Sequence, residues 1–278
     1  MTHTFIALKK REDSKARLNL SVSKAKTFLD CKAKYKFCYI EKLPRKEQDF
    51  HIFGKFLHAV LENFHRAIIN DPELRNDYPP VLKKAWEDAL AQYTDKLIPE
   101  QVEYAKKITD EYELLLVKTG IPNVTSVEKE FYIQIDDRIL LNGFIDRVQD
   151  DVDLIHVADY KTTKEVKYLA NDFFQLKTYG FVLAALDPAV EKIRASYIML
   201  KHNFRFLTKE FTRKEVIEDV LSKFVSIADN IEAEKVWRPN PTMLCKYCDY
   251  LENCNSGRRY LEKKGMIERK TTPGVCSW

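Results

Sequence analysis

The first part of the chain carries the apolar spacing of helices. Hydrophobic residues recur at helical intervals over 21–40, from Gly54 onward and over 79–118. Ser21 and Ser23 stand where N-cap hydroxyls would start the first of these helices. This part of the chain is therefore predicted to be mainly helical.

Beyond Val124 the apolar period shortens to two, which is the period of a half-buried strand. The alternation predicts three consecutive strands, over 127–135, 139–148 and 154–160. The polar turn 149–153 is short enough to join the second and third strands as an antiparallel hairpin. The elements expected after them are a helix, two strands and a further helix, over 172–186, 195–200, 204–211 and 213–234.

These elements predict a fold of the α/β (α+β) class, with a mixed central sheet flanked by helices. The length of 278 residues suits one elaborated domain, 1–278. Its expected parts are a polar N-terminal segment, an N-terminal helix, an inserted helical region, the core, and a cysteine-bearing loop with a basic tail: 1–20, 21–54, 55–120, 121–235 and 236–278.

Composition narrows the class of protein. Hydrophobic residues make up 45% and charged residues 32% of the chain, which suits a globular protein with a sizeable core. The longest apolar runs fall far short of the roughly 20 residues of a membrane helix, and no signal segment opens the chain. We therefore expect a cytoplasmic protein without a membrane partner. Lys and Arg outnumber Asp and Glu by only 46 to 42, but basic and aromatic residues gather over 24–46.

Acidic residues end two of the predicted strands. Asp159 and Lys161 are two residues apart, so they share one face of their strand, and Asp146 stands near the same end of the hairpin. Mg²⁺ and Mn²⁺ prefer carboxylate ligands, and a nearby lysine can orient water or stabilise phosphoryl charge. An exposed salt bridge is the commoner meaning of Asp-x-Lys alone. The apolar residues leading into each acid, such as Phe144 and Ile145, instead favour charges at the ends of buried strands, and such charges need a reason.

Four ordered motifs resemble those of a known family. Gly-x-x-x-His spans 54–58, Gly-x-x-Asp-Arg spans 143–147, Asp-x-Lys-Thr spans 159–162, and Gln-x-x-x-Tyr spans 175–179. In this order they are similar to the motifs of the PD-(D/E)XK nuclease superfamily, and within it of the RecB-like nucleases. The resemblance covers the chain from Ser21 to about Cys254 and implies a restriction-endonuclease-like core.

The resemblance implies a role for each motif residue. Lys161 would position the attacking water or balance the charge of the transition state, and Gln175 and Tyr179 would line the DNA path. Glu130, at the start of the first strand, is a weaker candidate, and the other histidines have no comparable support. The implied ligands of Mg²⁺ or Mn²⁺ are His58, Asp146, Asp159 and the backbone carbonyl of Tyr160.

Three of the six cysteines form a Cys-x2-Cys-x5-Cys cluster over 245–254. A disulfide framework is not expected in a chain of this size, and the cluster needs a fourth ligand to hold either Zn²⁺ or a 4Fe-4S centre. Several RecB-like nucleases, including the AddB subunit and the nuclease of CRISPR adaptation, pair such a cluster with one N-terminal cysteine. Cys38 and Cys276 are expected to be free thiols unless one of them replaces that cysteine. The implied ligands of a 4Fe-4S staple between the N- and C-terminal parts are Cys31, Cys245, Cys248 and Cys254.

The resemblance implies a metal-dependent DNA nuclease. Stand-alone relatives of this size are commonly exonucleases of replication, recombination, repair or phage and CRISPR processing, in a prokaryotic or phage-infected cell. The chain lacks Gly-x4-Gly-Lys-Ser/Thr, so an ATP motor would belong to a helicase or recombination partner. The side chains expected to grip phosphates are Lys32, Lys34, Lys36, Arg147, Arg258 and Arg259.

Two other classes of protein stay open. A catalytically silent DNA-binding scaffold would keep the fold and lose the acids or the lysine, and these are intact. A zinc-stapled nucleic-acid-binding module would differ in colour, because Zn²⁺ has no visible absorbance. Polarity, strandedness, and DNA against RNA are not fixed by the sequence.

Overall fold

The computed structural model describes residues 5–45, 48–151, 154–164, 166–167 and 169–268. The chain forms two compact units, each built from two segments that are distant in sequence. The sheet unit comprises Met1–Val22 and Gln48–Ala228, and the cysteine unit comprises Ser23–Glu47 and Asp229–Trp278. The two segments expected to supply the cysteine ligands therefore belong to one unit.

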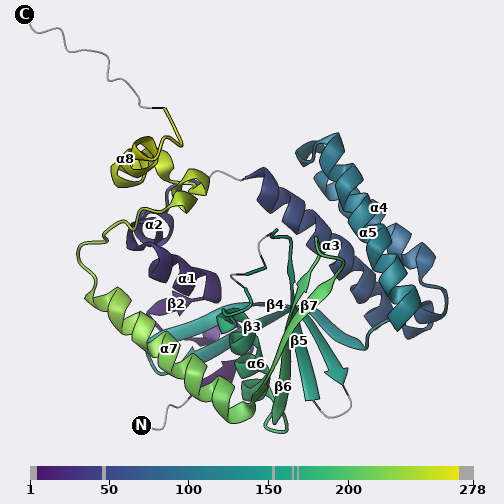
Figure 1. Cartoon of the computed structure of the whole chain (residues 1–278). Coiled ribbons are helices and arrows are strands. Elements are labelled where there is room, and N and C mark those ends of the chain that lie inside the picture. Colours follow the sequence, from purple (N-terminus) through teal and green to yellow (C-terminus); the bar gives the residue numbers. More distant parts are fainter. Residues whose placement is uncertain (1–4, 46–47, 152–153, 165, 168, 269–278) are drawn as a thin grey trace, which may run out of the picture. The chain divides into compact units, whose positions relative to one another are not determined.

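A mixed seven-stranded sheet forms the centre of the sheet unit (Figure 1). Six strands run in the order β1-β3-β4-β5-β6-β7, and β2 pairs with β4. The pairs β2–β4 and β5–β6 are parallel, and the others are antiparallel. The strands are β1 (Phe5–Leu8), β2 (Leu18–Leu20), β3 (Val124–Ile135), β4 (Ile139–Asp151), β5 (Leu154–Lys161), β6 (Lys192–Met199) and β7 (Arg205–Thr212).

Different helices cover the two faces of this sheet. Helices α3, α4 and α5 pack in one hydrophobic core with Tyr160 and Ile198, and Figure 1 shows them as one group. Helix α6 packs on the opposite face, where Gly180 lies against Ile193. Because side chains alternate along a strand, Tyr160 faces α3 and Asp159 faces α6. These helices are α3 (Asp49–Asn70), α4 (Pro79–Tyr93), α5 (Pro99–Thr119) and α6 (Phe174–Leu186).

Aromatic side chains hold the two segments of the cysteine unit together. Tyr35 stacks on Trp237, with ring centroids 5.9 Å apart and an interplanar angle of 3°. Phe28 meets both rings edge-on, and Asn240 Nδ2 donates to the Asp30 carbonyl at 3.0 Å. The helices that form or lead into this unit are α1 (Val22–Asp30), α2 (Lys32–Tyr35), a π-helical turn (Lys36–Ile40), α7 (Arg213–Ala233) and α8 (Asn255–Lys263).

The structure confirms the mixed α/β class with a central mixed sheet and helices. It also confirms the β4–β5 hairpin, whose turn residues 152–153 lie outside the described residues. The segment 1–20, for which no element was predicted, contributes the short strands β1 and β2. The expectation of a single helix over 21–40 was wrong, because the helix is broken at Cys31, whose backbone is extended (φ −160°, ψ 107°). No helix in the described part of the chain is long and apolar enough to cross a bilayer.

Candidate active site

Acidic side chains from neighbouring strands face one another where the β4–β5 ladder ends. The register of β3 and β4 on either side places Glu128 opposite Asp146, so both project from one face of the sheet. The ladder between β4 and β5 ends at Arg147, one residue short of Asp146. Beyond that point the backbone amide of Tyr160 donates to Asp146 Oδ2 at 3.2 Å. The strands thus separate where the acids stand.

Helix α3 brings His58 into this opening. Its Nδ1 lies 3.3 Å from Asp146 Oδ2, and its Nε2 lies 2.9 Å from the Tyr160 carbonyl oxygen. Gly54, one turn earlier, allows the helix to come close to the end of β5, because a Cβ there would stand 3.2 Å from Thr162 Oγ1. The Gly-x-x-x-His spacing therefore has a packing reason as well as a chemical one.

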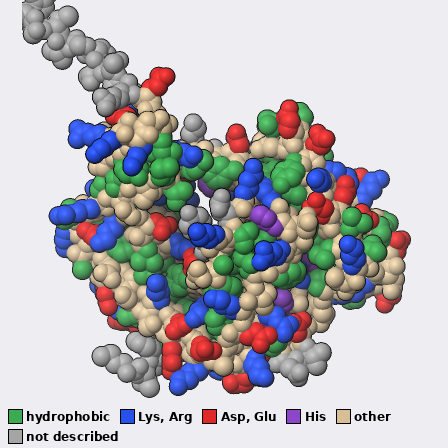
Figure 2. Space-filling model, viewed as in Figure 1, with side chains coloured by type: hydrophobic (Ala, Val, Ile, Leu, Met, Phe, Trp, Pro, Cys, Tyr) green, Lys and Arg blue, Asp and Glu red, His purple; other side chains and the backbone are tan. Residues whose placement is uncertain are grey.

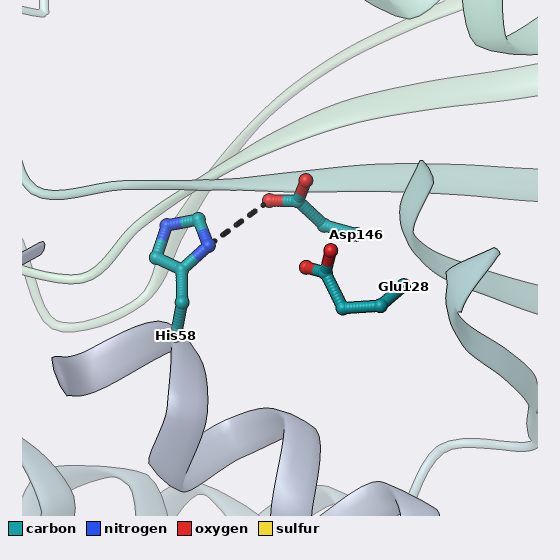
Figure 3. A group of neighbouring side chains, drawn as sticks. All are labelled: His58, Glu128 and Asp146. Atoms are coloured by element: carbon teal, nitrogen blue, oxygen red, sulfur yellow. Dashed lines mark ion pairs between the residues drawn. The ribbon is translucent and has the colours of Figure 1, made fainter. Parts of the chain in front are cut away.

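Figure 3 shows His58, Glu128 and Asp146 directed toward one another from α3, β3 and β4. One ligand atom from each lies within 4.8 Å of the others. An imidazole nitrogen and two carboxylates form a donor set that suits a divalent cation. The group as a whole fits a Mg²⁺ or Mn²⁺ site.

Asp159 stands beside this group and is held by a lysine and a glutamine. Lys161 Nζ lies 2.5 Å from Asp159 Oδ2 and donates to Gln175 Oε1 at 3.0 Å. The amide nitrogen of Gln175 donates to Asp159 Oδ1 at 2.6 Å and to the Tyr179 hydroxyl at 2.8 Å. Helix α6 therefore fixes both partners of the Asp-x-Lys motif through one side chain.

The acids of this site repel one another in a partly buried position. Burial, followed by the charge of Asp159, raises the pKa of Asp146 well above its usual value. Burial, followed by the charges of Glu62 and Asp159, raises the pKa of Glu128. Burial lowers the pKa of His58, so its ring is favoured in the neutral form that binds metals. A bound cation would lower the raised pKa values of the two carboxyl groups and would favour the neutral imidazole further.

Glu128 was missed by the sequence interpretation, which named Glu130 as the weaker acidic candidate. Glu130 instead accepts a hydrogen bond from the Tyr132 hydroxyl at 2.6 Å and is exposed. Strand alternation places both glutamates on one face and does not tell which one meets Asp146. Only the β3–β4 register does so, together with the left-handed backbone of Glu128 (φ 45°). No signal in the sequence reveals either feature.

Arg147 differs from the expectation that it grips a phosphate. Its side chain is on the face opposite Asp146 and is only 3% exposed, so in this structure no DNA backbone can reach it. It donates to Gln149 and, at 3.4 Å, to the Tyr160 hydroxyl. Because Arg147 is buried on the face of β4 that does not carry the acids, its role is structural.

The other basic residues proposed for phosphate binding lie in the cysteine unit. Three of them form ion pairs, Lys32 with Glu234, Lys36 with Glu41 and Arg258 with Glu252. Arg259 is exposed, and Lys34 lines the cysteine pocket described below. Figure 2 shows Lys and Arg interspersed with Asp and Glu over the visible face. Surface charge on this face does not by itself mark a path for nucleic acid.

The four cysteines expected to hold a metal cluster line one pocket within the cysteine unit. Backbone amides donate to two of the sulfurs, from Thr242 to Cys245 Sγ at 3.3 Å and from Gly257 to Cys254 Sγ at 3.4 Å. Burial raises the pKa of Cys248. Cys38 is separate, because its sulfur accepts from Arg45, and Cys276 lies outside the described residues. The lining residues of the pocket include Cys31, Cys245, Cys248, Cys254, Phe37, Pro239 and Leu251.

Comparison with known proteins shows which family of proteins the chain matches. The model of the PD-(D/E)XK nuclease superfamily matches residues 19–255 of the chain. A solved structure of a protein described as a candidate exonuclease, from Eubacterium rectale, covers 96% of this chain and 93% of its own, with 11% identity and a TM-score of 0.51. That likeness is one of fold alone. A structure of the protein SSO0001 covers 81% and 95%, with 16% identity, and its TM-score of 0.33 carries no argument. No curated protein compared with the chain matches it.

Proposed function

Because the chain belongs to the PD-(D/E)XK nuclease superfamily, we propose that it is a metal-dependent deoxyribonuclease that degrades DNA as an exonuclease. The observation that carries the proposal is the convergence of His58, Glu128 and Asp146 beside the Asp159–Lys161 pair. DNA as substrate and action from an end rest on the resemblance to the RecB-like nucleases.

The residues present fit a divalent cation. His58, Glu128, Asp146, Asp159 and the Tyr160 carbonyl would hold Mg²⁺ or Mn²⁺, and the raised pKa values of two of these acids reflect a site short of positive charge. When bound, the ion would polarise a phosphoryl oxygen and offset the negative charge of the reaction centre. Binding would also favour the ionised carboxylates, since ligands must be deprotonated.

Lys161 would act on the reacting atoms. Its side chain is a quarter exposed and its ammonium group pairs with Asp159, so it can hydrogen-bond the attacking water or a phosphate oxygen. Gln175 would keep Lys161 and Asp159 in register, because it bonds to both. Tyr179 anchors the amide of Gln175 and would act through it rather than on the substrate.

Cleavage of end-labelled DNA tests the proposal. We expect the wild type to degrade linear strands with Mg²⁺ or Mn²⁺, to spare circular strands and to stop in EDTA. Asp159→Ala and Lys161→Ala should each lower kcat by about 100-fold or more, the effect of removing one electrostatic stabiliser. Asp137→Ala, in the exposed β3–β4 turn, is the matched control and should be fully active. Normal cleavage by the Asp159 variant would refute the site, and cleavage of circular DNA would refute the exonuclease assignment.

We also propose that Cys31, Cys245, Cys248 and Cys254 bind a 4Fe-4S centre. Their shared pocket and the backbone N–H groups directed at two of the sulfurs support this, because such hydrogen bonds stabilise cluster thiolates. Zn²⁺ is the alternative occupant.

On the resemblance alone, we propose that the protein works with a helicase or recombination partner. The same resemblance proposes a place in replication, recombination, repair or phage and CRISPR processing.

A further inference from the structure

Phe144 is a large apolar side chain left exposed beside the acids. It precedes Asp146 by two residues in β4, so both side chains project from one face, about 7 Å apart along the strand. Its side chain is 51% exposed, although the apolar pattern around it predicts a buried strand. The exposed part of Phe144 is therefore accessible to a ligand that approaches the acids.

A second aromatic group lies on the other face of the sheet, where α3 packs. Phe53, about 7.5 Å from His58 along the helix axis, stacks on Tyr104 of α5 with ring centroids 5.8 Å apart and an angle of 11°. Phe53 is buried, but Tyr104 is 40% exposed. The pair presents an aromatic platform rather than a closed core contact.

Lys201 adds positive charge to this platform. Its ammonium group lies 4.6 Å from the centre of the Phe53 ring and 5.7 Å from that of Tyr104. Lys201 follows Leu200, whose amide donates to the Lys161 carbonyl at 2.9 Å, so the platform begins where the catalytic strand ends. Burial and the nearby Lys164 lower the pKa of Lys201, an effect that a bound anion would reverse.

We propose that Phe144 and the Tyr104–Lys201 platform bind unpaired bases and the adjoining phosphate of a single DNA strand on either side of the strand opening. Aromatic rings next to lysines are the chemistry that binds single strands, because each unpaired base offers a flat face for stacking. The bases of a duplex are stacked on one another and do not offer that face. The inference rests on the proposed action on DNA and specifies its strandedness.

Binding without metal tests this inference independently of cleavage. In EDTA, we measure the affinity of the full-length protein for a fluorescent single-stranded oligonucleotide and for its duplex. Phe144→Leu and Tyr104→Leu should each weaken single-strand binding by about 5- to 100-fold, the range for loss of one base–aromatic stack. Phe144→Trp and Tyr104→Phe, which keep a ring, should retain the affinity.

Phe206→Leu is the matched control, since Phe206 is a phenylalanine of the same unit, on β7 and 42% exposed. An oligonucleotide with abasic residues near the cleaved bond should bind the wild type as weakly as the normal oligonucleotide binds Phe144→Leu. The two losses should not add, because both remove the same stack.

Equal affinity of the Phe144, Tyr104 and Phe206 leucine variants, or preferred binding of the duplex, would overturn the inference. Absence of cleavage with this binding pattern intact would overturn only the proposed function.

Discussion

Glu128 adds a second carboxylate to the site beside Asp146. The β3–β4 register on either side places it opposite Asp146, and its left-handed φ of 45° is a conformation that few non-glycine residues adopt. Strain of this kind is kept where the surrounding structure needs the side chain in that place. We infer that Glu128 is a metal ligand rather than a surface charge.

Glu128→Gln should raise the Mn²⁺ concentration for half-maximal cleavage by at least about tenfold, because it removes a charged ligand. The same substitution should not destabilise the metal-free protein, since it relieves repulsion with Asp159 and Glu62. Calorimetric Mn²⁺ titration and thermal unfolding in EDTA measure the two effects. Glu130→Gln, on the same strand, is the control and should leave the Mn²⁺ requirement unchanged. Equal requirements for the two variants would exclude Glu128 as a ligand.

The alternation of side chains along a strand predicted some positions in the site correctly and others not. It placed Asp159 and Lys161 on one face correctly, and it puts Arg147 on the face opposite Asp146, which conflicts with the phosphate-binding role given to Arg147. It could not show that Phe144 is exposed, because exposure depends on which elements pack over that part of β4. Those are tertiary facts that local periodicity does not contain.

At the scale of elements, α6 is held against the sheet by a small residue. Gly180 lies so close to its neighbours that an added Cβ would stand 2.9 Å from Ile193 Cγ2 of β6 and 3.4 Å from Val216 Cγ1 of α7. The helix also carries Gln175, which holds the Asp159–Lys161 pair. The close packing of α6 therefore supports the geometry of the site.

Gly180→Ala should lower the free energy of unfolding by about 1–3 kcal/mol through overpacking, against a gain of up to about 1 kcal/mol in helix propensity. It should also lower kcat, because a displaced α6 moves Gln175. Urea unfolding and cleavage rates measure both. Ile193→Ala leaves a cavity, and adding it to Gly180→Ala should cost less than the sum of the two single effects. Additive losses would show that the two residues do not contact.

Local pattern predicted long elements better than short or interrupted ones. The helix over 213–234 and the hairpin were found because their periods persist for many residues. The strands β1 and β2 span four and three residues, too few for alternation to be seen, and their partners in β3 and β4 are far away in sequence. The break at Cys31 has no glycine or proline to mark it. Its extended backbone instead accompanies a cysteine that lines the pocket.

At the scale of the whole molecule, the cysteine unit encloses the main segment of the sheet unit in sequence. Cys31 comes before that segment, and the three other pocket cysteines come after it. A cluster bound to all four would close a loop of more than 200 residues. Chain entropy makes such a closure more stabilising as the loop lengthens, up to about 5 kcal/mol by analogy with disulfides.

Cys248→Ser should therefore abolish the absorbance near 400 nm of anaerobically purified protein and lower its Tm by several degrees, since binding free energy of the metal is folding free energy. Iron and sulfide analysis, the visible spectrum and thermal unfolding measure the effects together. Cys38→Ser is the matched control, because Cys38 contacts Arg45 and is not among the cysteines that line the pocket, so it should keep iron, colour and Tm. Zinc without iron in the wild type would replace the 4Fe-4S assignment but keep the staple. A Cys248 variant with full metal content and unchanged Tm would refute the assignment of Cys248 as a ligand of the staple, because a ligand cannot be removed without loss of binding free energy that stabilises the folded state.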